Sequence, residues 1–225
     1  MRVGIIGGTG PAGRALATRL SVCGPEVLIG SRAPERAAEV VAALREEWPE
    51  HTLALEGVAN EEAAAADIVV LATPWEGAVA TAIDLAPILE GRVLVSMVNA
   101  LHRAGREFQA LVPVRGSIAA TLQAAVPTAR VTTAFQHVPA GPLANLHESI
   151  ECDVFVCGDD AGAQRATIEL VEVIPGFRGV RAGSLASANA VEALTAVLVN
   201  VNVAYRGHVA IRLVGHTGHL GAGRD

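Results

Sequence analysis

The sequence predicts an α/β fold built on a doubly wound, mostly parallel β-sheet. Short apolar runs such as residues 67–72 are typical of strands that are buried on both faces, and amphipathic stretches separate them. Of the 225 residues, 51% are hydrophobic and only 3% are aromatic, which suits thin strands packed against alanine-rich helices. A glycine-rich turn follows the first strand directly. Together these observations favour a Rossmann-type domain with a small C-terminal helical portion.

The first 21 residues carry the most informative motif. A strand over residues 3–6 leads into Gly8-Thr9-Gly10-Pro11-Ala12-Gly13, and an amphipathic helix follows. This order is typical of a dinucleotide-binding βαβ unit, in which the N–H groups of the helix N-terminus bind a pyrophosphate. Gly8 is expected to permit the turn, Gly10 to admit the phosphates and Gly13 to let the helix pack closely, while Pro11 suits the first helical turn. An ordinary tight turn is the alternative.

The end of the second strand indicates which nucleotide is bound. Residues 25–29 predict a strand that leads to Ser31 and Arg32, with Arg36 one helical turn further on. NAD-selective enzymes carry an acidic residue here, whereas a hydroxyl and guanidinium groups can bind a 2′-phosphate. We therefore expect the cofactor to be NADP(H). The alternative makes Ser31 a helix cap and both arginines solvated surface residues.

The remaining pattern divides the chain into two parts. We expect a NADP-binding domain over residues 1–182, and a C-terminal helix and tail over residues 183–225. Further helices are predicted over residues 34–48, 78–89, 118–125, 161–173 and about 185–213, and further strands over residues 67–72, 92–96, 130–137, 153–158 and 178–181. Residues 138–142 are expected to break the chain sharply after the strand that precedes them.

Composition excludes several classes of function. The net charge is −6 and no basic block occurs, so we expect no nucleic-acid partner. Three scattered cysteines predict a reducing, cytoplasmic environment and no metal site, and the pair His216 and His219 is not assigned to a metal. No signal peptide precedes the first strand, and the apolar residues 193–205 are few for a bilayer span, so no membrane partner is expected.

Several motifs together resemble those of the F420H2:NADP oxidoreductases. They are GGTGPAG, GSR, the strand-end TPW at residues 73–75, VP at 138–139, ANL at 144–146 and VCGDD at 156–160, and the likeness runs from Met1 to about Val203. The resemblance implies direct hydride transfer between nicotinamide C4 and the deazaflavin C5 of coenzyme F420, without a metal or a protein nucleophile. It also implies that Thr9, Ser31, Arg32 and the following basic position hold the 2′-phosphate.

The resemblance places the deazaflavin over the nicotinamide, near residues 97–99, residues 136–138 and the last helix. Two positions depart from the family pattern, because Gln136 stands where the family can carry a histidine and Asn189 where some members have an arginine. The nicotinamide half of the site therefore matches the family better than the deazaflavin half does.

Direct hydride transfer requires only that the two rings be held in contact, so no catalytic side chain is predicted. We expect an apolar slot in which a first group of residues contacts the nicotinamide nucleotide and a second group contacts F420. The first group is Thr73, Pro74 and Trp75, and the second is Met97, Val98, Asn99, Gln136, His137, Val138 and Pro139. Trp75 could instead be a core residue, and His137 could either polarise a deazaflavin carbonyl or be a hydrogen-bonded residue at the strand end. A basic rim for the acidic tail of F420 is expected at His102, Arg103, Arg106 and Arg115.

The last helix is apolar around most of its circumference, which predicts a homodimer contact and a cover for the deazaflavin, or else burial within its own chain. Two other functions remain open: an NADPH-dependent reductase of another small molecule (an imine, a ketone or a flavin), and a non-catalytic NADPH sensor. Carbonyl and imine reductases usually need a proton donor near the hydride acceptor. This chain has no lysine, and its one tyrosine, Tyr205, lies in the last helix.

Overall fold

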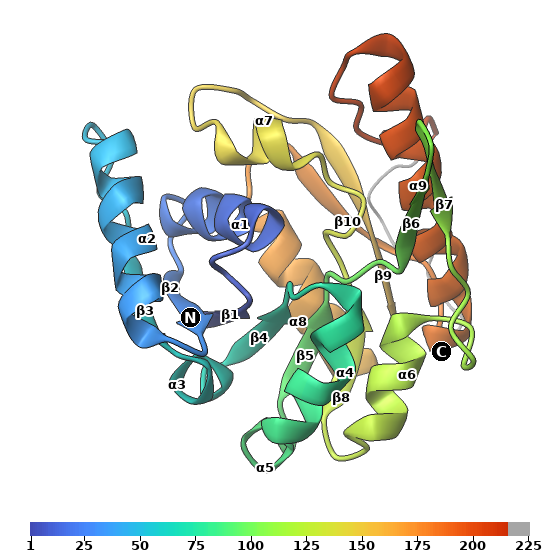
Figure 1. Cartoon of the computed structure of the whole chain (residues 1–225), viewed down its shortest axis with the longest axis horizontal. Helices are drawn as coiled ribbons and strands as arrows, with labels where there is room; N and C mark the ends of the chain where they lie inside the picture. Colours follow the sequence, from blue (N-terminus) through green and yellow to red (C-terminus); the bar gives the residue numbers. More distant parts are fainter. Residues whose placement is uncertain (216–225) are drawn as a thin grey trace.

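The computed structural model describes residues 1–215 and consists of an eight-stranded sheet with helices on both faces (Figure 1). Neighbouring strands are parallel except for β8 and β9, which run antiparallel. From one edge to the other the strands are β10 (Phe177–Arg181), β9 (Cys152–Gly158), β8 (Arg130–Thr133), β5 (Val93–Ser96), β4 (Ile68–Leu71), β1 (Arg2–Ile6), β2 (Glu26–Ser31) and β3 (Leu55–Ala59). The predicted fold class is confirmed.

Two hydrophobic clusters, one on each face, hold the helices to this sheet. Along β1, Val3 and Ile5 belong to one cluster and Ile6 to the other, because successive strand residues point to opposite faces. The first cluster packs against α1 (Pro11–Ser21), α2 (Pro34–Glu47) and α8 (Ala161–Glu172), and the second against α3 (Asn60–Ala64), α4 (Trp75–Asp84), α5 (Ala86–Leu89) and α6 (Ile118–Ala125). Burial on both faces explains the uninterrupted apolar runs in the strands.

A β-hairpin replaces the polar segment around His102, and the sequence did not predict it. It consists of β6 (Leu101–Ala104) and β7 (Glu107–Ala110), and it lies beside α9 (Ala188–Tyr205) at the right of Figure 1. Asn200 of α9 fixes this contact, since its Oδ1 accepts the Phe108 N–H at 2.7 Å and its Nδ2 donates to the Phe108 carbonyl at 2.9 Å.

The last helix is shorter than predicted. It ends at Tyr205, because Arg206 adopts a left-handed conformation with φ 53°, and a separate 3₁₀ turn covers Leu185–Ser187. The chain then runs along β9, where the Asp153 N–H donates to the Ile211 carbonyl at 2.7 Å. His216 and His219 lie outside the described residues.

Two other predicted bounds are wrong. The strand expected over residues 130–137 stops at Thr133, and the expected break at residues 138–142 contains a short helix, α7 (Ala140–Ala144). Arg19 of α1 holds the end of this helix by donating to the Pro142 and Leu143 carbonyls at 2.8 and 3.1 Å. The chain therefore leaves β8 early and passes over α1.

By length and composition, one helical segment among residues 1–215 could cross a membrane. It is Leu185–Tyr205, which contains an 18-residue window with a mean hydropathy of 1.2, and 28% of that window is buried. A single segment of this kind is weak evidence for a membrane span, because helices that pack in the core of a soluble protein meet the same criteria. Polar side chains of this segment bond to the rest of the chain: besides Asn200, the buried Glu192 carboxylate accepts the N–H groups of Ile118 and Ala119 at the start of α6.

Candidate functional site

A cavity of about 920 Å³ opens at the carboxyl ends of the central strands. It spans the place where β1 lies between β4 and β2, so the direction of winding reverses there, which is where open α/β sheets bind ligands. Nine of the residues predicted for the nicotinamide nucleotide line it: Thr9, Gly10, Pro11, Ala12, Ser31, Arg32, Arg36, Thr73 and Pro74.

The turn after β1 follows the expected pattern with one addition. The addition is Gly7, which takes the left-handed conformation with φ 78°, while a Cβ at Gly8 would lie 2.9 Å from the Ile5 carbonyl oxygen. The role expected of Gly13 agrees with the structure, since a Cβ there would lie 2.8 Å from the Gly7 carbonyl oxygen, so only glycine lets α1 pack this closely. The consequence is a compact turn that directs the start of α1 toward the cavity.

The start of α1 has the properties of an anion site. Gly10 is its N-cap and Pro11 its first residue, and among residues 1–215 no side chain accepts from the first N–H groups of the helix. Thr73 lies against the same turn, since a Cβ at Gly7 would come within 2.9 Å of it, and its hydroxyl oxygen is buried without a hydrogen-bond partner among residues 1–215. Buried polar groups in native proteins are normally bonded, so a ligand that supplies a partner for this hydroxyl fits the cavity.

Ser31, Arg32 and Arg36 meet at the end of β2 and form the positive side of the cavity. Both arginines are exposed, and neither guanidinium forms an ion pair or hydrogen bond with a residue in the described part of the chain. The Ser31 Oγ accepts the Ala33 N–H at 3.2 Å, which leaves its O–H able to donate to a phosphate oxygen. Ser31 does not cap α2, whose N-cap is Ala33. This set of donors suits a 2′-phosphate in an otherwise acidic protein.

Three residues assigned to the nicotinamide nucleotide do not line the cavity. Gly8 and Gly13 lie beneath the turn, where they permit close packing. Trp75 is half-buried at the start of α4 and packs against the cluster on the other face of the sheet. For Trp75 the structure therefore favours the alternative, a core residue.

Of the residues predicted for F420, the structure joins Asn99 and Gln136, and none of the set lines this cavity. Asn99 follows β5 and Gln136 follows β8, and the Asn99 Nδ2 donates to the Gln136 carbonyl at 2.8 Å. From α9, the Thr195 hydroxyl lies 3.3 Å from both the Asn99 Oδ1 and the Gln136 carbonyl oxygen. The last helix is thus bonded to both loops. The Gln136 side-chain amide is buried and has no hydrogen-bond partner among residues 1–215.

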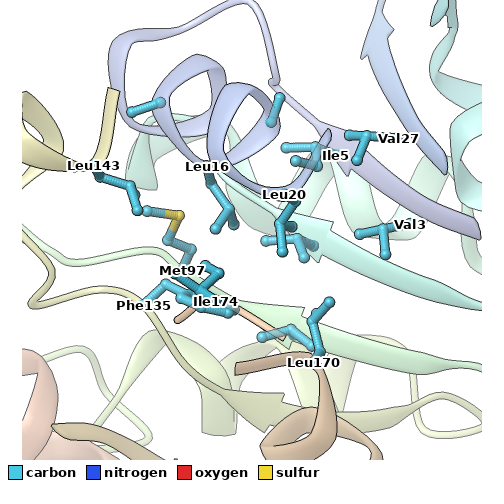
Figure 2. Close-up of a cluster of buried hydrophobic side chains, with 14 of the residues drawn as sticks. Val3, Ile5, Leu16, Leu20, Val27, Met97, Phe135, Leu143, Leu170 and Ile174 are labelled. Carbon is cyan, nitrogen blue, oxygen red and sulfur yellow. The ribbon is translucent and has the colours of Figure 1, made fainter. Parts of the chain in front are cut away.

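The apolar members of the F420 set are core residues in this structure. Met97 packs among Leu16, Phe135 and Leu143 below α1 (Figure 2). Val98 belongs to the cluster on the opposite face, and Val138 and Pro139 are also buried. These residues therefore do not form the expected apolar slot for the deazaflavin within the 920 Å³ cavity.

A strained turn positions the Gln136–Pro139 loop. Phe135 has φ 66°, which is uncommon for a bulky residue, and the Val138 N–H closes the turn on the Phe135 carbonyl at 3.0 Å. Strained backbone of this kind costs on the order of 1–3 kcal/mol and clusters at functional sites. It turns the chain away from β9 and leaves a gap beside that strand.

His137 fills part of the gap. On this edge of β9, the Phe155 N–H donates to the His137 Nε2 at 3.1 Å. The N–H groups on either side find other acceptors: Asp153 donates to the Ile211 carbonyl, and Cys157 donates to the Thr133 hydroxyl oxygen. Because its Nε2 accepts a hydrogen bond, His137 is neutral with its proton on Nδ1. This geometry favours the alternative for His137, a hydrogen-bonded residue at the strand end.

Burial lowers the pKa of His137 to about 4, against the opposing effects of its backbone hydrogen bond and the Asp153 charge. Between the unfolded pKa near 6.5 and about 4, the unfolded chain binds a proton that the folded protein does not bind. We therefore expect this residue to lower the free energy of unfolding by up to about 3 kcal/mol as the pH falls from 6.5 to 4. Urea titrations of the protein and of His137→Gln, which keeps an acceptor for Phe155, would measure it. Equal pH slopes in the two proteins would contradict the assignment.

The expected basic rim is dispersed. His102 and Arg103 lie on β6, Arg106 in the hairpin turn and Arg115 before α6, and all four are exposed. The β6–β7 hairpin lies beside α9, on the opposite side of the molecule from β2 and α2 (Figure 1). The rim stays a prediction.

Sequence reasoning missed seven residues that line the cavity: Gly7, Gly30, Ala33, Asn60, Ala72, Gly77 and Thr81. Most adjoin predicted residues, so the motif could have included them. Asn60 differs because it follows β3, a strand that was not predicted. Asn60 could have been placed at the carboxyl edge of the sheet only if Leu55–Ala59 had been predicted as a strand.

The fold and this cavity define a Rossmann-type α/β protein with a ligand site at the strand ends, and the comparisons with known proteins narrow the class. The family model for coenzyme F420-dependent NADP oxidoreductases matches residues 2–100. The F420-dependent NADP reductase of Methanocaldococcus jannaschii is 33% identical over 211 residues, covering 92% of this chain and 94% of that protein. This chain belongs to the family of F420-dependent NADP reductases, as the sequence predicted.

Solved structures agree with this assignment. A crystal structure from Arthrobacter sp. FB24, described as an F420-dependent NADP reductase, superposes with a TM-score of 0.78 at 25% identity and covers 95% of this chain and 100% of that one. An imine reductase from Bacillus cereus has a TM-score of 0.59 at 19% identity, covering 91% of this chain and 60% of that chain. The second similarity shows the fold alone.

Proposed function

We propose that this protein transfers a hydride between NADP(H) and coenzyme F420. The observation that carries the proposal is the cavity at the ends of β1, β2 and β4, which is lined both by a helix N-terminus and by two arginines whose guanidinium groups have no partner among residues 1–215. Family membership supports F420 as the second partner, since relatives that match over nearly the whole chain are F420-dependent NADP reductases.

The residues of the chain act by binding and orientation. The start of α1 holds the pyrophosphate, and Ser31, Arg32 and Arg36 hold the 2′-phosphate. Thr73 and Pro74, which line the cavity at the end of β4, border the nicotinamide. With both coenzymes bound, the hydride would pass directly from ring carbon to ring carbon, and the proton that accompanies reduction of the deazaflavin would come from solvent, so the transfer requires no metal and no protein nucleophile. Asn99, Gln136 and Thr195 fix the loops and the helix beside which the deazaflavin would lie.

The experiment that tests this function follows the visible absorbance of F420 during turnover with NADPH deuterated at C4. We expect bleaching of F420 and recovery of the label at C5 of the reduced deazaflavin. Turnover with free flavin or an imine, but not with F420, would replace the proposal with another NADPH-dependent reductase. Tight NADPH binding without turnover of any acceptor would favour a sensor.

We also propose a homodimer in which residues 183–225 provide a contact and cover the deazaflavin. Exposed apolar side chains support it: Val197 and Val203 of α9 are 55% and 52% exposed, Tyr205 is 81% exposed, and Val112 beyond the hairpin is 77% exposed. A surface with this many large apolar groups is typical of an interface between subunits.

Sedimentation equilibrium tests the dimer. We expect twice the chain mass of 23.1 kDa for the protein, and the single-chain mass for a Val197→Asp, Tyr205→Asp variant, because charges are costly in an apolar interface. A control with Ile83→Asp, at an apolar residue that is 52% exposed on α4, should remain dimeric. A wild-type mass of one chain would refute the dimer. The cytoplasmic location and the lack of membrane and nucleic-acid partners stay predictions.

A further inference from the structure

Asn60 presents a buried polar group that has no partner in the described part of the chain. It is the first residue of α3, it is only 8% exposed, and it lines the cavity. Its Oδ1 is buried and accepts no hydrogen bond from residues 1–215. An unbonded buried acceptor destabilises the fold, so its presence in the wall of a binding cavity calls for a ligand that donates to it.

The position of Asn60 indicates which part of the nucleotide it would meet. Its neighbour Ala59 pairs with Ser31 across β2 and β3. A Cβ added to Gly30 would come within 3.0 Å of the Asn60 Oδ1, so the amide lies against the end of β2. Thr73, which follows β4, lies on the other side of β1 in the strand order. Asn60 is therefore at the end of the cavity that holds Ser31 and Arg32, the adenosine end.

Resting on the NADP(H) binding proposed above, we propose that Asn60 is a specificity residue that binds the adenosine moiety of the nucleotide. Its Oδ1 can only accept, and a phosphate at neutral pH offers only acceptors, so the 2′-phosphate cannot satisfy it. The adenine amino group and the ribose 3′-hydroxyl both donate. A carboxamide can also bond adenine in a bidentate manner, accepting from N6 and donating to a ring nitrogen.

Binding of NADPH and NADH to Asn60→Ala tests the proposal, since the two nucleotides share adenosine and differ in the 2′-phosphate. We expect the Kd to rise about three- to tenfold for both nucleotides and by the same factor, as for loss of one hydrogen bond. Glu62→Ala, an exposed residue on the same helix, is the matched control and should leave both Kd values unchanged. An unchanged Kd in Asn60→Ala, or a rise for NADPH alone, would overturn the proposal.

Nicotinamide hypoxanthine dinucleotide phosphate, which lacks the adenine amino group, separates the base from the ribose. If Asn60 contacts the base, the variant should bind this analogue as well as the wild type does. If Asn60 contacts the ribose, Asn60→Ala should raise the Kd for the analogue by the same factor as the Kd for NADPH. Each result supports binding of adenosine and identifies the atom that donates.

A structural role for Asn60 is distinguished by the stability of the nucleotide-free protein. The fold provides no hydrogen bond to the Oδ1, so Asn60→Ala and the similarly sized Asn60→Leu should keep or raise the melting temperature while binding nucleotide more weakly. A lower melting temperature in both variants with an unchanged Kd would show a purely structural residue and overturn the inference. Wild-type protein that fails to bind NADPH would instead refute the function of the whole cavity.

Discussion

Replacing Gly10 with valine is expected to abolish NADPH binding while the protein remains folded. A Cβ at Gly10 would meet only the Gly7 carbonyl oxygen, at 3.4 Å, so the backbone accommodates a side chain. The two methyl groups would instead project toward the cavity that Gly10 lines, where the phosphates must approach the helix N-terminus. Calorimetric titration with NADPH should give no measurable heat, with the circular dichroism spectrum unchanged.

Gly207→Val is the matched control for this prediction. Gly207 also has open space around its Cβ position, and it lies outside the cavity. Its variant should bind NADPH with wild-type affinity. Wild-type affinity in Gly10→Val would show that the phosphates do not pass this turn, and the glycine motif would lose its assigned role.

Replacing Arg32 with alanine should raise the KM for NADPH about ten- to a hundredfold and leave the KM for NADH nearly unchanged. The guanidinium lies in the cavity wall without an ionic partner among the described residues, so its charge is available for a 2′-phosphate. Loss of such a charge-assisted contact costs about 1.5–3 kcal/mol. Steady-state kinetics with the two nucleotides, at constant ionic strength, measure the difference.

Arg165→Ala removes an exposed arginine from α8 and serves as the control for net charge. It should change neither KM, because Arg165 does not line the cavity. If Arg32→Ala raised the KM for NADPH and the KM for NADH by the same factor, Arg32 would bind a group that both nucleotides share. The assignment of Ser31, Arg32 and Arg36 to the 2′-phosphate would then be wrong.

The phosphate-binding half of the site could be predicted because it depends on local sequence. A strand, a glycine turn and a helix start occupy consecutive residues, and Ser31 and Arg32 come at the end of the next strand. Even there, the motif did not include Gly7, which is the left-handed residue of the turn, since adjacent glycines do not reveal which of them takes a positive φ.

The parts that escaped prediction depend on tertiary contacts. Strand β3 is a short edge strand with Glu56 and Gly57 in its centre, so it lacks an apolar run and was not predicted. Without this strand, nothing in the sequence placed Asn60 at the carboxyl edge of the sheet. The β6–β7 hairpin is polar and is held by hydrogen bonds from Asn200, which lies 92 residues from Phe108 in the sequence. His137 likewise acquires its role from Phe155, a residue on a strand that the sequence could not place beside it.

Titration of the purified protein with NADPH and then with NADH tests the central claim most directly, namely that the cavity at the ends of β1, β2 and β4 binds a 2′-phosphorylated dinucleotide. The account predicts one NADPH site per chain and NADH binding at least about tenfold weaker, the difference expected for one or more charge-assisted phosphate contacts. No heat with NADPH, or equal affinity for the two nucleotides, would contradict it.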